Sequence, residues 1–140
     1  MDINIRIGEV LRRGRLMSLA TIDESGPWVS DLIYVHDDSF CLYWISRVGR
    51  RHSLAIASHP HAACSITIEK LKKDLGLQME GKAQQLNAAP VVADAYWKKR
   101  GAPKVPISDE HAWYQFTPTK IELLDEKNFG VVKQEYTPNS

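Results

Sequence analysis

Apolar residues recur at helical spacing near the start of the chain and then alternate with polar residues through most of the rest. Residues 3–13 place apolar side chains on one helical face and are followed by Gly14, so they predict a short amphipathic helix. A second helix is predicted over 51–60, ending before Pro60, and a third over 87–101. Strand patterns occupy 15–22, 27–35, 40–46, 61–69 and 75–86, and one or two further strands are expected within 111–125.

Short turn-forming segments at 23–26 and 36–39 separate the first three predicted strands, which therefore predict an antiparallel meander. With the later strands, the pattern predicts a mainly β protein. We expect a six-stranded antiparallel split β-barrel, with short helices covering its open ends. Residues 1–140 are expected to form a single domain, with an irregular C-terminal tail over 126–140.

Charge and composition narrow the function. The formal net charge is +1 with acids and bases interspersed, which argues against the broad basic surface of a duplex-DNA-binding protein. No apolar run is long enough to cross a bilayer, and the first residues lack an export signal, so no membrane partner and a cytoplasmic location are expected. Cys41 and Cys64 lie within apolar runs and are expected to be buried thiols. The histidines and carboxylates predict no metal site.

Positive charge is concentrated where a predicted strand gives way to a predicted helix. Ser46 ends the strand, Gly49 permits a tight turn, and Arg50, Arg51 and His52 open the helix. Helix N–H groups and arginine together bind phosphate well, and a dianionic phosphate favours protonated His52. The same three residues are also compatible with a solvated helix start that binds nothing, so the basic cluster alone leaves both interpretations open.

The segment "FCLYWISRVGRRHSLAIASHPHAACSITI" resembles the central part of the pyridoxamine 5'-phosphate oxidase-like flavoproteins, which are FMN-binding split barrels. Ser46 takes the position of the family's Thr or Ser, Arg51-His52 that of its Arg-Lys pair, and His59-Pro60 that of its Asn-Pro. The later "LGLQMEGKAQQL" is similar to the family's long strand, and the order of elements agrees over nearly the whole chain.

The resemblance implies an FMN site. It places the FMN phosphate against the basic cluster and Ser46, and the isoalloxazine ring along the end of the second strand. There it would lie near four consecutive residues, Val29, Ser30, Asp31 and Leu32. The family's flavin-contacting Gln falls at Gly76, so Gln78, two residues later on the same face, is the candidate. The resemblance also implies a homodimer with the flavin between its subunits.

Two function classes remain open. The first is an FMN-dependent oxidoreductase acting on a small molecule, with the flavin as the redox carrier. The second is a non-catalytic flavin carrier, or a relative that holds haem or another cofactor in the same barrel. The Arg-x-His element that binds substrate in the true oxidases is absent, which gives weight to the second class and keeps it open beside the first. Among the tryptophans, Trp28 and Trp113 are the candidates for contact with flavin or substrate, although most tryptophans pack in cores or interfaces.

Overall fold

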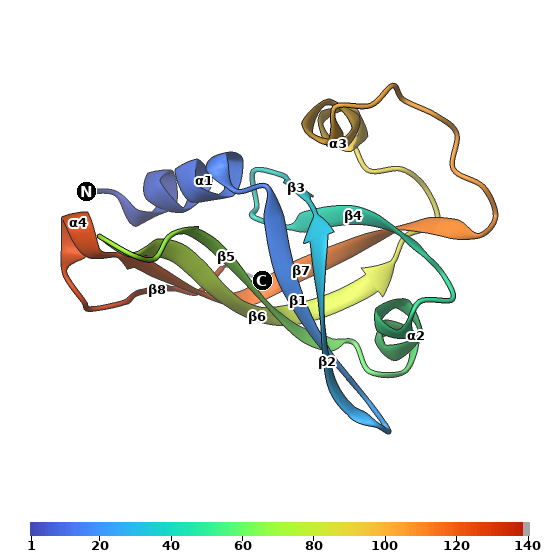
Figure 1. Ribbon diagram of the computed structural model, residues 1–140, viewed down its shortest axis with the longest axis horizontal. Coiled ribbons are helices and arrows are strands. Elements are labelled where there is room, and N and C mark those ends of the chain that lie inside the picture. The colour runs from blue at the N-terminus through green and yellow to red at the C-terminus, as the bar shows by residue number, and fades with distance from the viewer. Residues whose placement is uncertain (139–140) are drawn as a thin grey trace.

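A single curled antiparallel sheet forms the body of the protein in the computed structural model, which describes residues 1–138 (Figure 1). The order of strands across the sheet is β2-β1-β5-β6-β7-β4-β3, and β8 pairs with β7 beside this path. The strands are β1 (Leu16–Asp23), β2 (Gly26–Ile33), β3 (Val35–His36), β4 (Leu42–Arg47), β5 (His61–Glu69), β6 (Leu75–Gln85), β7 (His111–Asp125) and β8 (Gln134–Tyr136). The six main strands of the predicted split barrel are confirmed, and β3 and β8 are short additions to them.

Helices lie at the ends and along the side of this sheet (Figure 1). The helix α1 contacts β3, β5 and β6, α2 contacts β1, β2 and β6, and α3 contacts β2 and β3. The helices are α1 (Ile3–Arg13), α2 (Arg51–Ser58), α3 (Ala93–Arg100) and α4 (Glu126–Phe129). The prediction for α2 is confirmed, since it ends just before Pro60. The predicted third helix is too long, because residues 87–92 form a loop before Ala93.

The predicted meander of the first three strands forms its two antiparallel pairings, but its middle strand is broken. The strands β1 and β2 form the expected hairpin, but the predicted strand 27–35 is split at Tyr34, whose hydroxyl donates to the Leu11 carbonyl at 2.7 Å. The part after Tyr34 becomes β3, which pairs with β4 at the opposite end of the sheet. Because one residue joins the two ends of the strand order, the sheet must curl to bring those ends together, although β2 and β3 do not pair with each other.

The inner face of the sheet carries the core. Along β6, Leu75, Leu77 and Met79 are buried while Gln78 and Glu80 are exposed, so the alternation seen in the sequence sets which face turns inward. On the neighbouring strands β4 and β7, Trp44 stacks on its cross-strand partner Tyr114 with 5.8 Å between ring centroids. The apolar interior therefore closes around these strands and leaves polar groups for the ends and the outside.

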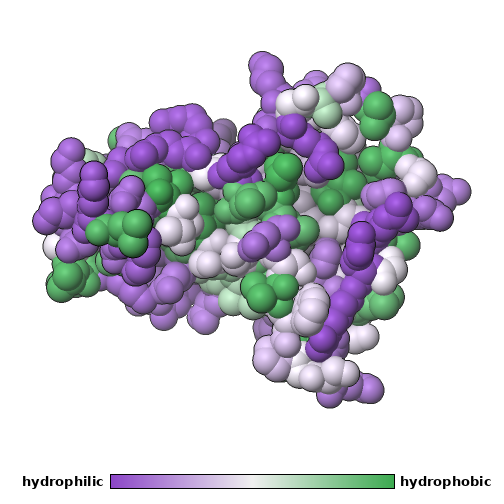
Figure 2. All heavy atoms as spheres, in the orientation of Figure 1, coloured by the Kyte–Doolittle hydropathy of each residue, from purple (hydrophilic) through white to green (hydrophobic). Residues whose placement is uncertain are grey.

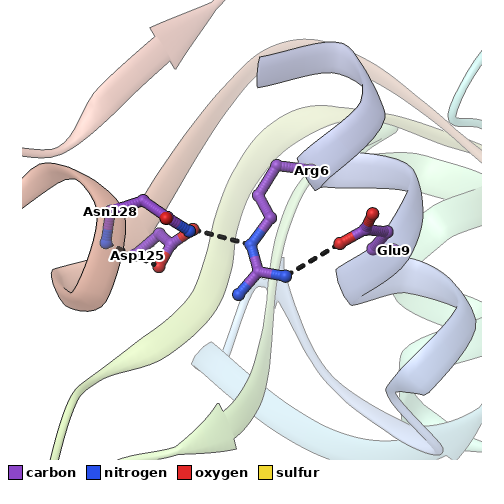
Figure 3. A network of polar contacts seen from close by, with 4 residues as sticks. All are labelled: Arg6, Glu9, Asp125 and Asn128. Carbon is purple, nitrogen blue, oxygen red and sulfur yellow. Dashed lines mark hydrogen bonds and ion pairs between the residues drawn. The ribbon is translucent and has the colours of Figure 1, made fainter. Parts of the chain in front are cut away.

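The C-terminal tail is not irregular throughout, contrary to the prediction. Asp125 caps α4 by accepting from the Asn128 backbone and side chain, and it also accepts from Arg6 Nε of α1 at 2.6 Å (Figure 3). Arg6 in turn pairs with Glu9 at 2.8 Å. Burial alone would raise the pKa of Asp125, but the bonds from Asn128 and Arg6 outweigh it and hold the pKa below its ordinary value. This network fastens the start of the tail to α1; residues 139–140 of the predicted tail lie outside the described residues.

Candidate anion site at the start of helix α2

The turn between β4 and α2 leaves open amide groups at the helix start. Ser53 Oγ donates to the Arg47 carbonyl at 2.7 Å, and the Arg50 amide donates to the same carbonyl at 3.2 Å, which fixes the turn. Arg50 is the N-cap residue, and its side chain makes no capping hydrogen bond. The first amides of α2 therefore keep free N–H groups, and the positive end of the helix dipole lies beside them.

His52 lies inside the barrel end rather than on its surface. Its Nε2 contacts Ser46 Oγ at 2.9 Å, and its Nδ1 contacts Ser30 Oγ at 3.2 Å, so the ring joins β4 to β2. Burial, and secondarily the charge of Arg50, lowers the pKa of His52 below its ordinary value. The ring is therefore neutral near pH 7 in this state, unlike the protonated imidazole that the sequence suggested.

Arg51 turns away from His52, toward the tip of the β1–β2 hairpin. Its Nε and Nη2 donate to the two carboxylate oxygens of Asp23 at 2.9 and 3.1 Å. Its guanidinium carbon lies 4.5 Å from the centre of the Trp28 ring, a cation–π contact. The hydrogen bonds from Arg51 hold the pKa of Asp23 below its usual range. Asp23 was missed by sequence reasoning, because a turn carboxylate gives no sign of a partner 28 residues later.

An open cleft of about 470 Å³ separates the hairpin tip from α2. Asp23, Glu24 and Ser25 line one side, and Arg51, Leu54 and His59 line the other. Arg50 is exposed and forms no ion pair within residues 1–138. Arg50 thus provides the uncompensated positive charge of the cluster, whereas the charge of Arg51 is already balanced by Asp23.

The predicted ring-contacting residues lie on two faces of β2. Ser30 is paired with Leu19 and Leu32 with Met17, both fully buried, so these two residues point inward. Val29 and Asp31 point outward: Val29 is 61% exposed, and Asp31 accepts from Ser18 Oγ at 2.7 Å.

Gln78 belongs to the outer face of the same sheet. It lies opposite Ser65 of β5, which lies opposite Ser18 of β1, the partner of Asp31. Its side-chain oxygen accepts from Lys133 Nζ at 2.5 Å. Within one chain, Gln78 is therefore aligned with Asp31 and is separated by the sheet from the inward-facing Ser30, Ser46 and His52.

A larger cleft of about 570 Å³ lies between α3, the 102–110 loop and the outer face of β4. Its walls are mainly apolar, with Ile45, Tyr96 and Trp97 among them, and His111 lies at its edge. Trp113, a sequence candidate for flavin contact, is instead buried and packs on Tyr96 with 5.2 Å between ring centroids. Trp113 serves the packing of α3 on the sheet.

The fold and the sequence can now be compared with known proteins. A family model described as pyridoxamine 5'-phosphate oxidase matches residues 3–125. The chain belongs to this family. The match confirms the resemblance inferred from the central segment and places all the candidate residues within the family domain. No similarity to a curated protein was found.

Solved structures of the same fold include the General Stress Protein 26 of Bacillus anthracis, with a TM-score of 0.78 and 16% identity over 98% of this chain and 99% of that one. An F420 reductase gives a TM-score of 0.65 and 20% identity, covering 81% of this chain and 93% of the other. The heme storage protein of Vibrio cholerae gives a TM-score of 0.63 and 13% identity, covering 99% of this chain and 96% of that one. At these identities the likeness concerns the fold. No helix within residues 1–138 is long and apolar enough to cross a membrane.

Proposed function

We propose that this protein binds FMN at the start of α2 and acts as a flavin-dependent oxidoreductase on a small molecule. The observation that carries the proposal is the uncompensated Arg50 beside the open amide groups of α2. Arg51 follows Arg50 in the chain and keeps N–H donors that Asp23 does not use, while the Ser46 hydroxyl lies near the end of β4 against His52. This donor set is suited to a phosphate monoester, so the residues present fit the cofactor that the family implies.

Each residue has a separate task in this proposal. Arg50 and Arg51 hold the phosphate, and His52 fixes the rotamers of Ser46 and Ser30 through its two ring nitrogens. The backbone of residues 29–32 offers N–H and C=O groups to the polar edge of the ring. The bound flavin would supply the redox chemistry, while the protein orients it and sets its surroundings.

A homodimer is part of the proposal. The outer face of β1 and β2 exposes Leu16, Ile22 and Val29, which are apolar and unpartnered in the single chain. A second copy on this face would cover them. It would also bring the outward-facing Gln78 of one subunit toward the flavin of the other, which the single chain does not do. Light scattering is expected to give about twice the chain mass at micromolar concentration, and a monomer that retains flavin would contradict the shared site.

Absorbance of the purified protein tests the cofactor directly. Flavin bands, with FMN released on denaturation, are expected, and the absence of flavin after reconstitution would refute the proposal. Anaerobic addition of NADH or NADPH then distinguishes an enzyme from a carrier, because an oxidoreductase that accepts these donors bleaches the flavin bands. If NADH, NADPH and a panel of chemically similar hydride donors all fail to bleach the flavin bands, a non-catalytic flavin carrier is favoured.

Haem binding is the second candidate, and the cleft beside α3 is the observation that favours it. His111 Nδ1 contacts Ser108 Oγ at 3.0 Å, which leaves Nε2 without a partner among residues 1–138 at the edge of a mainly apolar cavity. An imidazole nitrogen that faces apolar walls is a suitable axial ligand for haem. A Soret band after haem addition that shifts in His111→Ala would support this candidate, whereas a band unaffected by that change would rule out this cleft.

A further inference from the structure

A cleft of about 300 Å³ lies between α1, β3 and α3, apart from the start of α2. Figure 1 shows β3 between the end of α1 and α3, at the opposite side of the sheet from α2. We call this cleft the basic cleft. Its walls combine apolar residues with basic ones: Leu11, Val35 and Ala95, and Arg12, His36, Lys98 and Lys99.

Among residues 1–138, the lining of this cleft includes basic side chains and no acidic one. Arg12, Lys98 and Lys99 form no ion pair within residues 1–138. The acids that are close in the chain lie outside the lining: Asp37 accepts from Tyr43 and backbone amides, Asp38 is exposed, and Asp94 of α3 pairs with Lys104. Basic residues are common in the last turn of a helix, but here the last turns of two helices converge on one cavity. The result is a concave surface of positive potential.

Lys99 is the lysine of the basic cleft that contacts an aromatic ring. Its Nζ lies 3.6 Å from the centre of the Tyr34 ring, and the Tyr34 hydroxyl is fixed on the Leu11 carbonyl. Arg15 donates to the Lys99 carbonyl at 3.2 Å and adds a like charge nearby. Burial and, second, Arg15 lower the pKa of Lys99 to about 8, so the ammonium is poorly compensated in the absence of an anion.

We propose that the basic cleft binds a small ligand that carries one carboxylate or phosphate on an apolar body, with the anionic group against Lys99. Arg12 and Lys98 flank this position, and Leu11, Val35 and Ala95 contact the apolar body. The site is independent of the FMN site, because the two share no residues. Binding of the anion stabilises the ammonium form of Lys99, and therefore couples ligand binding to proton uptake.

Calorimetry with benzoate, phenyl phosphate and neutral benzyl alcohol tests the site. Both anions are expected to bind with dissociation constants of about 1 mM or below, and the alcohol at least about tenfold more weakly. The stronger of the two anions identifies the preferred head group. Lys99→Met, which keeps the aliphatic stem, is expected to weaken the preferred anion about tenfold or more. Lys82→Met, at an exposed position of β6 outside the cleft, serves as the matched control.

Proton uptake on ligand binding distinguishes direct contact between Lys99 and the anion from a purely structural role of this side chain. Near pH 8, binding heats measured in two buffers of different ionisation enthalpy are expected to show net proton uptake, lost in Lys99→Met but kept in Lys82→Met. His36, whose pKa is lowered by burial and by Lys99, is neutral near that pH and does not confuse the result. Equal binding of anion and alcohol, no saturable binding of either anion, or affinity unchanged by Lys99→Met would each overturn the proposal.

Discussion

Replacing Arg51 with Ala tests whether this arginine binds the FMN phosphate or only holds the β1–β2 hairpin against α2. If the remaining N–H donors of Arg51 bind the FMN phosphate, the loss of this charge-assisted contact weakens FMN about tenfold to hundredfold. Riboflavin, which has no phosphate, is expected to bind as it does to the wild type. Because Arg51 also ties Asp23 and Trp28 to α2, a small fall in the thermal midpoint accompanies the change.

Asp23→Asn is expected to act in the opposite direction. A phosphate on the far edge of the guanidinium would lie on the order of 7 Å from the Asp23 carboxylate, where water-screened repulsion changes affinity about threefold. Removing that carboxylate charge should therefore tighten FMN by about that factor. It also replaces a carboxylate that accepts two hydrogen bonds with a neutral amide that has one acceptor oxygen, so the guanidinium turns more readily toward the anion.

Calorimetry of the variants against FMN and riboflavin measures both effects. Arg47→Ala is the matched control, because this arginine ends β4 close by but pairs with the exposed Glu110 at 3.1 Å. FMN affinity unchanged in Arg51→Ala, or riboflavin affinity reduced as much as that of FMN, would refute the phosphate role. Weaker FMN binding in Asp23→Asn would mean that Asp23 orients Arg51 instead of competing for it.

Two further predictions concern stability. Asp125→Asn is expected to cost about 3 kcal/mol of unfolding free energy in urea denaturation, because Asp125 is 1% and Arg6 16% exposed and the change breaks a buried pair. Glu9→Gln, at the 37% exposed partner of the same arginine, should cost less than about 1 kcal/mol, and equal costs would contradict the argument. The pKa of His52 is lower in the folded protein than its unfolded value of 6.5. The buried neutral ring therefore contributes fully to the free energy of unfolding above pH 6.5. This contribution is lost as pH falls from 6.5 toward the folded pKa, because the unfolded chain takes up a proton there. The urea midpoint should therefore fall less between about pH 7.5 and 5.5 in His52→Gln, and identical slopes would contradict the buried neutral ring.

Local sequence patterns predicted most of the helices and strands, because the residues that determine each element are close together in the sequence. The alternation along β6 states which side chains are buried, and the turn at 23–26 is sufficient for the β1–β2 hairpin. Gly49 and Pro60 bracket α2. The strand pattern predicted a barrel but not the break at Tyr34, where the side chain bonds to Leu11 of a helix at the start of the chain.

The candidate site was predicted as a set of residues, but their arrangement was not. Ser46, Ser30 and His52 do meet, although two strands and a helix from separate parts of the chain supply them. The pairing of Arg51 with Asp23 depends on where the hairpin tip lies relative to α2, which tertiary packing decides. Gln78 requires the register of three neighbouring strands before its outward position becomes evident.

The affinity of the wild-type protein for FMN compared with riboflavin tests the central claim most directly. The two flavins share the ring and differ by the phosphate, so their difference measures what Arg50, Arg51 and the start of α2 contribute. Calorimetry on flavin-free protein is expected to show FMN binding at least about tenfold more tightly than riboflavin, with the advantage shrinking as salt is added. Equal affinities for FMN and riboflavin, or no binding of either, would contradict an anion site at the start of α2.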